Sequence, residues 1–383
     1  MTNIKDSKLG IVLTGGGARA AYQVGVFKAI ADILPHQADN PFQIICGTSA
    51  GAINAASLAC YSANYRDAVR RILTIWANFR CEHVFRTDTL GIARTGARWM
   101  TSMMLAGLGK NNPHCLLDRA PLRSLLDKYI RTEYIQKAVD QGHIHAVSVT
   151  VSGYSSHQSV SFYHGHPDIE TWSRSRRIGC PSPLTTDHLM ASSAIPFLFE
   201  SIKVHREFFG DGSMRQIAPI SPALHLGADR VLVIGNRLEE DVTPERIKNP
   251  PYPTLGQIAG HALDSIFLDS LEADLERLER INRTIDLIPD RKKEKHGIEL
   301  RKVDVMVISP SEDMGEIARH YMHTLPRTIR FLMRGIGAGS KSNSSLASYL
   351  LFEKGYTRAL IDLGYHDAMQ KRQELKEILQ VQA

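Results

Sequence analysis

The sequence predicts an α/β fold of three layers, with helices on both faces of a mainly parallel central sheet. Short apolar segments typical of buried strands alternate with longer segments of helical periodicity along most of the chain. Strands that are separated by helices usually pair in parallel through right-handed crossovers. The exception is the pair 145–152 and 158–163, which surrounds the turn at 153–156 and predicts a hairpin.

The other elements follow from the same patterns. Residues 263–285 have amphipathic helical periodicity, and residues 241–255, rich in proline and charge, are typical of an exposed loop. The tail from 345 to 379 is predicted to be helical, with breaks near Gly355 and Gly364. Further strands are expected at 9–14, 42–46, 202–208, 230–235 and 303–308.

These elements predict one elaborated domain over residues 8–310. A helical C-terminal extension over 311–383 would then pack on this core or on a second protomer, so a homo-oligomer is an open alternative.

Composition indicates a globular protein without selecting a function. The 383 residues carry a net charge of +6 with a pI near 9.0, which is too mildly basic to predict nucleic-acid binding but is compatible with an anionic membrane surface. Five cysteines without a Cys-x-x-Cys spacing predict a reducing compartment and no disulfide framework. No secretory signal or spanning segment is visible, so we expect a cytoplasmic protein, or one peripheral at the inner membrane face.

Ser49 lies in a Gly-x-Ser-x-Gly pattern, between the apolar segment that ends at Cys46 and a helix-like run of small residues. Such a turn exposes a hydroxyl at the end of a strand, where an acyl carbon can reach it. The flanking Gly47 and Gly51 permit backbone angles and close approaches that a β-carbon would obstruct.

A glycine-rich turn, Thr14 to Arg19, follows the first predicted strand and precedes a helix-patterned stretch from Ala20. Backbone N–H groups at a helix N-terminus can hold a phosphate or the oxyanion formed when a serine attacks an ester. The run also fits the dinucleotide fingerprint, but the next strand candidate, 42–46, ends in Gly-Thr-Ser where that fingerprint needs an acid.

Asp211 lies on an Asp-Gly turn with Gly212, after the apolar run near 202–204. A carboxylate held on a tight turn is a group that could accept the proton of Ser49. From the residues alone a Ser–His–Asp triad stays open. The histidines that follow Asp211 are His225, His261, His296, His320, His323 and His366, and none has a distinctive local context.

Taken together, the chain resembles the patatin-like phospholipase family over residues 8–235. The stretch Gly15, Gly16, Gly17, Ala18 and Arg19 is similar to the family's oxyanion turn, Gly47 to Gly51 to its nucleophile elbow, and Asp211–Gly212 to its aspartate turn. Residues 191–196 are similar to its Ala-Ser-x-Ala-x-Pro segment. Two positions depart from the family pattern, Ala20 and Ser213, and Ala20 would matter if that position needed a positive φ.

The resemblance implies a patatin-like fold and a serine acyl hydrolase with a Ser–Asp dyad. Ser49 would attack the acyl carbonyl while Asp211 accepts its proton, and the N–H groups around Gly16, Gly17 and Ala18 would stabilise the oxyanion. Arg19 would fix the turn or add positive potential. The implied substrate is a lipid ester, a phospholipid or lysophospholipid, with no cofactor and no metal. A thioesterase, a neutral-lipid esterase and a non-catalytic lipid-binding module are the alternatives.

Two basic amphipathic stretches, 91–110 and 327–336, are candidates for lipid contact or a lid, but packing of their apolar faces on the sheet is the favoured interpretation for both. The histidine pairs at 143/145 and 164/166 lack a third ligand and a zinc-type spacing. Residues 173–177 form a short basic patch that is expected to be solvated.

Overall fold

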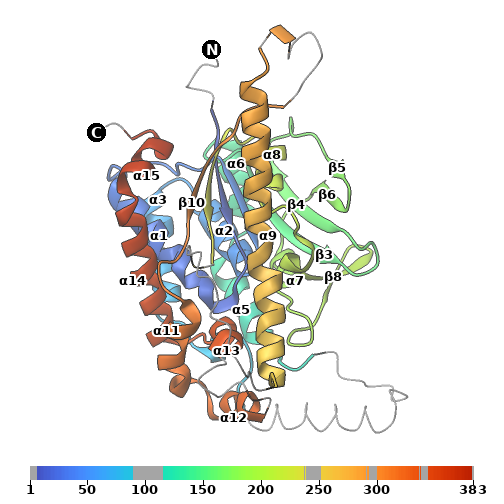
Figure 1. Cartoon of the computed structure of the whole chain (residues 1–383), viewed down its shortest axis with the longest axis vertical. Coiled ribbons are helices and arrows are strands. Elements are labelled where there is room, and N and C mark those ends of the chain that lie inside the picture. The colour runs from blue at the N-terminus through green and yellow to red at the C-terminus, as the bar shows by residue number, and fades with distance from the viewer. Residues whose placement is uncertain are drawn as a thin grey trace.

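A mixed sheet with helices on both faces forms the body of the protein (Figure 1). The computed structural model describes residues 7–88, 115–236, 238, 252–289, 291–292, 300–335, 337 and 344–381. The strands are β1 Leu9–Leu13, β2 Ile44–Thr48, β3 Ala146–Gly153, β4 Ser159–Gly165, β5 Ser173–Arg174, β6 Arg177–Pro181, β7 Ile202–Val204, β8 Glu207–Asp211, β9 Arg230–Ile234 and β10 Asp304–Ile308.

The helices alternate with these strands, as the sequence predicts. They are α1 Ala21–Ile33, α2 Ala50–Cys60, α3 Tyr65–Trp76, α5 Ala120–Tyr129, α6 Glu133–Asp140, α7 Thr186–Ser192, α8 Ser221–His225, α9 Leu255–Asp286, α11 Met314–Tyr321, α12 Arg327–Gly335, α13 Ser344–Leu350, α14 Lys354–Gln370 and α15 Arg372–Leu379. Short 3-10 turns occur at η2 Gly17–Ala20, η3 Cys81–His83, η4 Gly212–Arg215 and η5 Met322–Thr324.

The sheet runs in the order β10-β9-β1-β2-β3-β4-β6-β5, and its first five strands are parallel. β3 and β4 form the predicted antiparallel hairpin. The predicted single strand at 202–208 is wrong: β7 and β8 pair antiparallel around a turn at His205, whose φ is 53°. Residues 173–176 are exposed and Arg177 is half-buried, which confirms the solvated patch, and β5 and β6 pair there as a small hairpin at the edge of the sheet.

Helices cover both faces of the sheet, which confirms the predicted three-layer α/β arrangement. Ile11, Leu13 and Ile45 pack toward α1, α2 and α14. The alternate residues Val12 and Ile44 face the opposite side, where α8 and α9 cover the sheet. This alternation of apolar residues to both faces is typical of a parallel sheet that is buried on both sides.

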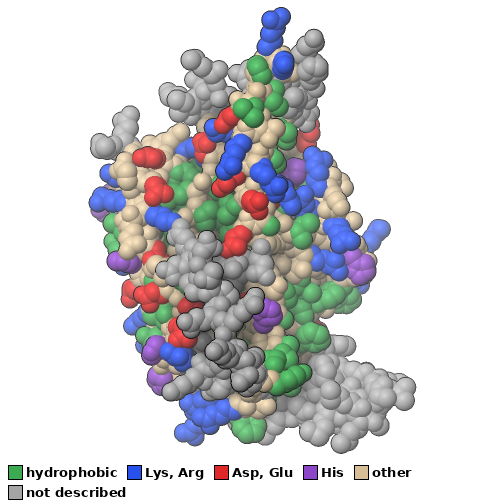
Figure 2. Space-filling view, viewed as in Figure 1, with side chains coloured by type: hydrophobic (Ala, Val, Ile, Leu, Met, Phe, Trp, Pro, Cys, Tyr) green, Lys and Arg blue, Asp and Glu red, His purple; other side chains and the backbone are tan. Residues whose placement is uncertain are grey.

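α9 is longer than the sequence predicts. It begins at Leu255 because Thr254 caps its N-terminus, accepting a hydrogen bond from the backbone N–H of Gln257 at 3.2 Å. The residues predicted as the end of a loop therefore belong to the cap and first residue of α9. Figure 2 shows acidic and basic side chains interleaved on its exposed face, while Phe267 and Leu278 are buried on the other.

The C-terminal tail is helical and is interrupted at 351–353, which confirms the break predicted near Gly355, and again at Lys371 between α14 and α15. The predicted break at Gly364 is wrong, since α14 runs through it and packs along α1. A β-carbon on Gly364 would lie 2.1 Å from the carbonyl oxygen of Tyr22 in α1, so this glycine permits a close helix crossing.

α12 is amphipathic in the structure. Ile329 and Met333 are buried in the core, whereas Phe331 and Leu332 are exposed beside the arginines of the same helix. The stretch 91–110 lies outside the described residues. Among the described helices, none combines the length and apolar character needed to cross a bilayer.

Candidate active site

Strand register brings Ser49 and Asp211 together. On one edge of β3, Thr150 pairs with Thr48, the last residue of β2, and the next residue, Val151, pairs with Asp211 at the end of β8. β8 thus continues along β3 where β2 stops, and its last side chain lies beside the residue that follows β2. Ser49 and Asp211, which are 162 positions apart in the chain, are brought together by this single strand.

Ser49 adopts a strained backbone at the turn between β2 and α2. Its φ of 56° lies in the left-handed region that residues with a side chain rarely occupy, as expected for a nucleophile elbow. A β-carbon on Gly47 would lie 2.4 Å from the Gly51 carbonyl oxygen, and one on Gly51 would lie 2.3 Å from that of Leu13. Both glycines of the pattern are therefore required by close backbone contacts.

Asp211 holds the Ser49 hydroxyl directly. Ser49 Oγ donates a 2.6 Å hydrogen bond to Asp211 Oδ2, and the Ser213 backbone N–H donates to Asp211 Oδ1 at 3.0 Å on the Asp-Gly turn. Both side chains are buried. Burial raises the pKa of the Asp211 carboxyl to about 6, against the opposing effects of the hydrogen bonds from Ser49 and Ser213 and of the Arg119 charge.

The glycine-rich turn follows β1, next to β2 and to Ser49, because Leu13 pairs with Gly47. The Thr14 and Arg19 backbone N–H groups donate to the carbonyls of Ile234 and Gly16, at 3.5 Å and 3.1 Å. Gly17 has a φ of 56°, a backbone conformation that favours glycine, and it lines the same cavity as Ser49. Ala20 has a φ of −64°, so its departure from the family pattern costs no backbone strain.

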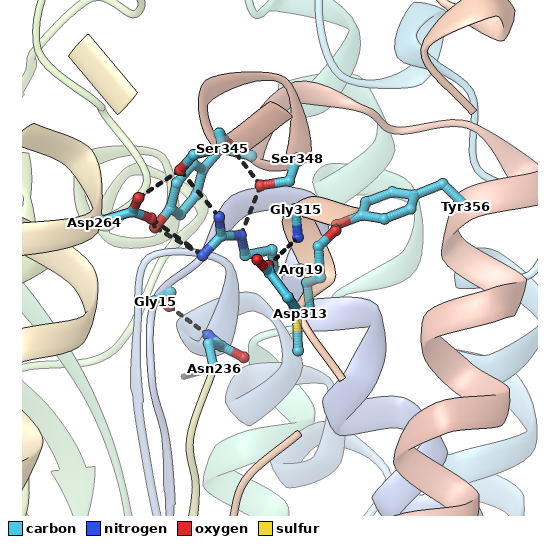
Figure 3. Close-up of polar contacts among 11 residues, drawn as sticks. Gly15, Arg19, Asn236, Asp264, Asp313, Gly315, Ser345, Ser348 and Tyr356 are labelled. Carbon is cyan, nitrogen blue, oxygen red and sulfur yellow. Dashed lines mark hydrogen bonds and ion pairs between the residues drawn. The ribbon is translucent and has the colours of Figure 1, made fainter. Parts of the chain in front are cut away.

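The Arg19 side chain points toward Ser348 of α13 and Asp264 of α9 (Figure 3). Its Nε donates to Ser348 Oγ at 2.7 Å, and its guanidinium lies 3.3 Å from Asp264 Oδ1. Of the two roles predicted for Arg19, this geometry favours fixing the turn.

Three further side chains hold the site, and sequence reasoning did not single them out. Ser192 Oγ accepts the Ser49 backbone N–H at 2.9 Å and donates to the Thr150 carbonyl at 2.6 Å. Asn236 donates to the Gly15 carbonyl. Arg119, buried, donates to the carbonyls of Met190 and Ser193 at 3.0 Å. Only Ser192 carried a sequence signal, since it lies in the block at 191–196; nothing local distinguishes the other two.

An apolar cavity extends from Ser49 and Gly17 between α2, α3 and α5. Aliphatic and aromatic side chains supply most of its wall, and Ser57 and Ser193 add hydroxyls. The apolar lining includes Ile53, Ile72, Trp76, Phe79, Leu122, Leu126, Phe199 and Phe352. A cavity of this kind suits a hydrocarbon chain.

Asp211 holds the position that a histidine base would take beside Ser49 Oγ. His225 instead stacks on Trp172, with ring centroids 5.0 Å apart, and His296 lies outside the described residues. His145 and His166 stack on each other at 5.7 Å. Within the described residues, no group of three or more histidine, cysteine or acidic side chains is placed to hold a metal ion.

The fold and the site together define an α/β protein in which a buried serine and a buried aspartate meet at the end of an apolar cavity. Residues 11–224, more than half of the chain, match the family described as patatin-like phospholipase. The chain therefore belongs to the patatin-like phospholipase family, whose members are lipid-ester hydrolases. The predicted resemblance is confirmed.

Similar solved structures include VipD from Legionella pneumophila, with 14% identity, a TM-score of 0.35, and coverage of 96% of this chain and 67% of that one. Human GIVD cytosolic phospholipase A2 is 12% identical with a TM-score of 0.45, covering 98% of this chain and 60% of the human one. The structure of that human protein in complex with methyl gamma-linolenyl fluorophosphonate is 13% identical with a TM-score of 0.42, and the match covers 98% of this chain and 59% of the human one. The chain thus spans about three fifths of the human protein. Comparison with curated proteins finds no match.

Proposed function

We propose that the protein hydrolyses phospholipid or lysophospholipid esters through a Ser49–Asp211 dyad and an acyl-enzyme. The observation that carries the proposal is the 2.6 Å hydrogen bond from Ser49 Oγ to Asp211 Oδ2, buried at the end of an apolar cavity. A serine hydroxyl is a weak nucleophile unless an adjacent base takes its proton, and Asp211 is the base within reach.

In the first step, Ser49 Oγ forms a bond to the ester carbonyl carbon while its proton passes to Asp211. The bond to the alcohol then breaks, and the alcohol leaves with the proton from Asp211. In the second step, water gives its proton to Asp211 and attacks the acyl-enzyme. Ser49 leaves with that proton, which frees the fatty acid and restores the ionised carboxylate.

The negative charge on the carbonyl oxygen needs hydrogen-bond donors in both steps. We assign this role to the backbone N–H groups of Gly16, Gly17 and Ala18. The neighbouring N–H groups of Thr14 and Arg19 are taken by backbone carbonyls, and Gly17 faces the cavity that contains Ser49.

The apolar cavity supports a fatty acyl group as the part of the substrate that the enzyme binds. The leaving group is not selected by the dyad, so a thioesterase or a neutral-lipid esterase stays the alternative within the enzyme class. A non-catalytic lipid-binding module is the alternative outside it. The strained φ at Ser49 favours catalysis over binding alone, because strain of this kind concentrates at reactive sites.

A release assay separates these alternatives. Purified protein is offered phospholipid, lysophospholipid, triacylglycerol and acyl-thioester substrates of the same acyl chain, and free fatty acid is measured. We expect the first two to be cleaved fastest. Preferred cleavage of the thioester or of triacylglycerol would replace the proposed substrate class, and no release from any would support the binding module.

Activity is expected to fall on the acidic side of about pH 6, because Asp211 accepts a proton only when it is ionised and its pKa is raised to about 6 by burial. Below this pKa Asp211 is protonated and cannot act as the base, so kcat/KM falls; above it Asp211 is ionised and kcat/KM reaches a plateau. The measurement is kcat/KM for a soluble ester between pH 4.5 and 8.5. If kcat/KM instead falls with a midpoint near pH 4, the ordinary pKa range of a carboxyl, burial does not raise the pKa of the catalytic base.

Narrowing the cavity is expected to shorten the acyl chains that are accepted. Ile53 lies one turn after Ser49 on α2 and lines the cavity, so Ile53→Trp should reduce kcat/KM for long-chain esters by roughly tenfold or more while short-chain esters change little. Ile317→Trp, at a partly buried position on α11 outside this cavity, is the control. Equal losses for long and short chains would mean that the acyl group lies elsewhere.

Contact of the exposed face of α12 with a lipid surface stays a prediction. Phe331 and Leu332 are exposed there beside Arg327 and Arg334, a combination that suits an anionic interface. A cytoplasmic location, a single domain over 8–310 with a C-terminal extension over 311–383, and a homo-oligomer likewise stay predictions.

A further inference from the structure

The Arg19 side chain is held by residues from the far end of the chain (Figure 3). Besides Ser348, it donates to the Tyr349 hydroxyl at 3.1 Å and to Ser345 Oγ at 3.3 Å. Asp264 closes the group, because its carboxylate accepts Ser345 Oγ at 2.5 Å and the Tyr349 hydroxyl at 2.7 Å. We call Arg19, Asp264, Ser345, Ser348 and Tyr349 the Arg19 clamp. Four of its members lie beyond residue 224, where the family match ends.

The clamp also touches the glycine-rich turn itself. A β-carbon on Gly17 would lie 2.3 Å from the Tyr349 carbonyl oxygen, so the end of α13 lies directly against the turn. The Phe267 ring of α9 lies against Gly15 and stacks on the Tyr349 ring, with centroids 5.1 Å apart. α9 and α13 together therefore form the outer wall of the turn.

A buried guanidinium needs a counter-charge, because an unpaired charge out of water is strongly unfavourable. Among the described residues, Asp264 is the acid in ion-pair distance of Arg19. Asp313 lies nearby but accepts the Gly315 backbone N–H at 2.7 Å as the cap of α11. Burial alone would lower the pKa of Arg19, but the surrounding Tyr349, Tyr356, Asp264 and Asp313 outweigh burial and raise it. The ion pair of Arg19 comes from α9, and its side-chain hydrogen bonds go to α13.

We propose that Asp264, supported by Ser345 and Tyr349, is a positioning residue that holds the oxyanion turn in its catalytic geometry through Arg19. The proposal rests on the proposed function, since it assigns to the turn the role of oxyanion donor. Donors of this kind stabilise the oxyanion only when they are correctly placed. A displacement of the turn therefore reduces the stabilisation of the transition state more than the binding of the substrate.

Asp264→Asn keeps the size of the side chain and removes the charge. We expect kcat to fall roughly tenfold while KM stays within about twofold of the wild-type value. The reason is that a misplaced donor reduces mainly the stabilisation of the transition state. Asp286→Asn is the matched control: it changes the same residue type on the same helix, where Asp286 pairs with Lys302 on the surface. It should leave kcat and KM unchanged.

Two companion variants separate positioning from general stabilisation. Tyr349→Phe keeps the ring that stacks on Phe267 and removes the hydroxyl, and should lower kcat by a smaller factor. Asp264→Glu restores the charge and should recover part of kcat. If Asp264→Asn lowers the melting temperature and the active fraction titrated by a fluorophosphonate, while kcat per active site stays at the wild-type value, the residue is structural and the proposal fails.

Amide hydrogen exchange tests the clamp without relying on turnover. In Asp264→Asn, peptides covering residues 14–20 should exchange faster than in wild type and in Asp286→Asn, while peptides of β3 should not change. Unchanged exchange in the turn would overturn the proposal even if the enzyme is active. Conversely, faster exchange in a protein that hydrolyses no ester would keep the clamp and reject the proposed function.

Discussion

Ser49→Ala is expected to reduce fatty-acid release by at least about a thousandfold, because it removes the atom that forms the acyl-enzyme. Folding should be preserved. The Ser49 backbone N–H, which donates to Ser192, is retained, and alanine meets no new contact at this position. The measurement is the initial rate of fatty-acid release from a phospholipid, together with the melting temperature.

The matched control is Ser57→Ala. Ser57 lines the same cavity on the same helix, but its hydroxyl donates to the Ile53 carbonyl at 2.8 Å and takes no part in the proposed chemistry. A fluorophosphonate should label wild type and Ser57→Ala on the peptide that contains Ser49, and should not label Ser49→Ala. Residual turnover of Ser49→Ala at the wild-type rate would place the nucleophile elsewhere.

Asp211→Asn is the second large effect, with turnover expected to fall roughly a hundredfold to ten-thousandfold. Asparagine has nearly the same shape and can still accept the Ser213 backbone N–H, but it cannot take the Ser49 proton. The measurement is kcat for a soluble ester between pH 6 and 8, where wild-type Asp211 is increasingly ionised. Retained turnover would move the general base to another group, such as a histidine.

The same variant makes a prediction about stability. The folded-state pKa of Asp211, about 6, lies above the usual aspartate value of 3.8, so the favourable contribution of the protonated carboxyl is present below about pH 4 and is lost as the pH rises through 6. Ionised Asp211 therefore lowers the stability of the wild type at neutral pH, by about 3 kcal/mol. Asp211→Asn should unfold at a higher temperature than wild type above pH 6, and this advantage should shrink toward pH 4. An advantage that is independent of pH would contradict the raised pKa.

Local patterns predicted the parts of the fold that depend on neighbouring residues. Alternating apolar runs gave the strands of the parallel sheet, and the turn at 153–156 gave the β3–β4 hairpin. The errors fall where a pattern is too short to show a turn. The β7–β8 turn at His205 carries neither glycine nor proline, and Gly364 looked like a helix break although it marks a close packing contact between α14 and α1.

The sequence by itself determined the chemical groups of the candidate site: Ser49 between two glycines, Asp211 before Gly212, and a glycine-rich turn after the first strand. Each of these groups can be identified from a few adjacent residues, because the tight turns that carry them require glycine at particular positions. Only the tertiary structure decided how the groups meet. The pairing of β3 with both β2 and β8 places Asp211 on Ser49, and the packing of α9 and α13 supplies Asp264 and Tyr349 to Arg19. Asp264 and Tyr349 lie more than two hundred residues from Arg19 in the chain. Nothing in their local sequence distinguishes them from other acids and tyrosines, because their role depends on long-range packing.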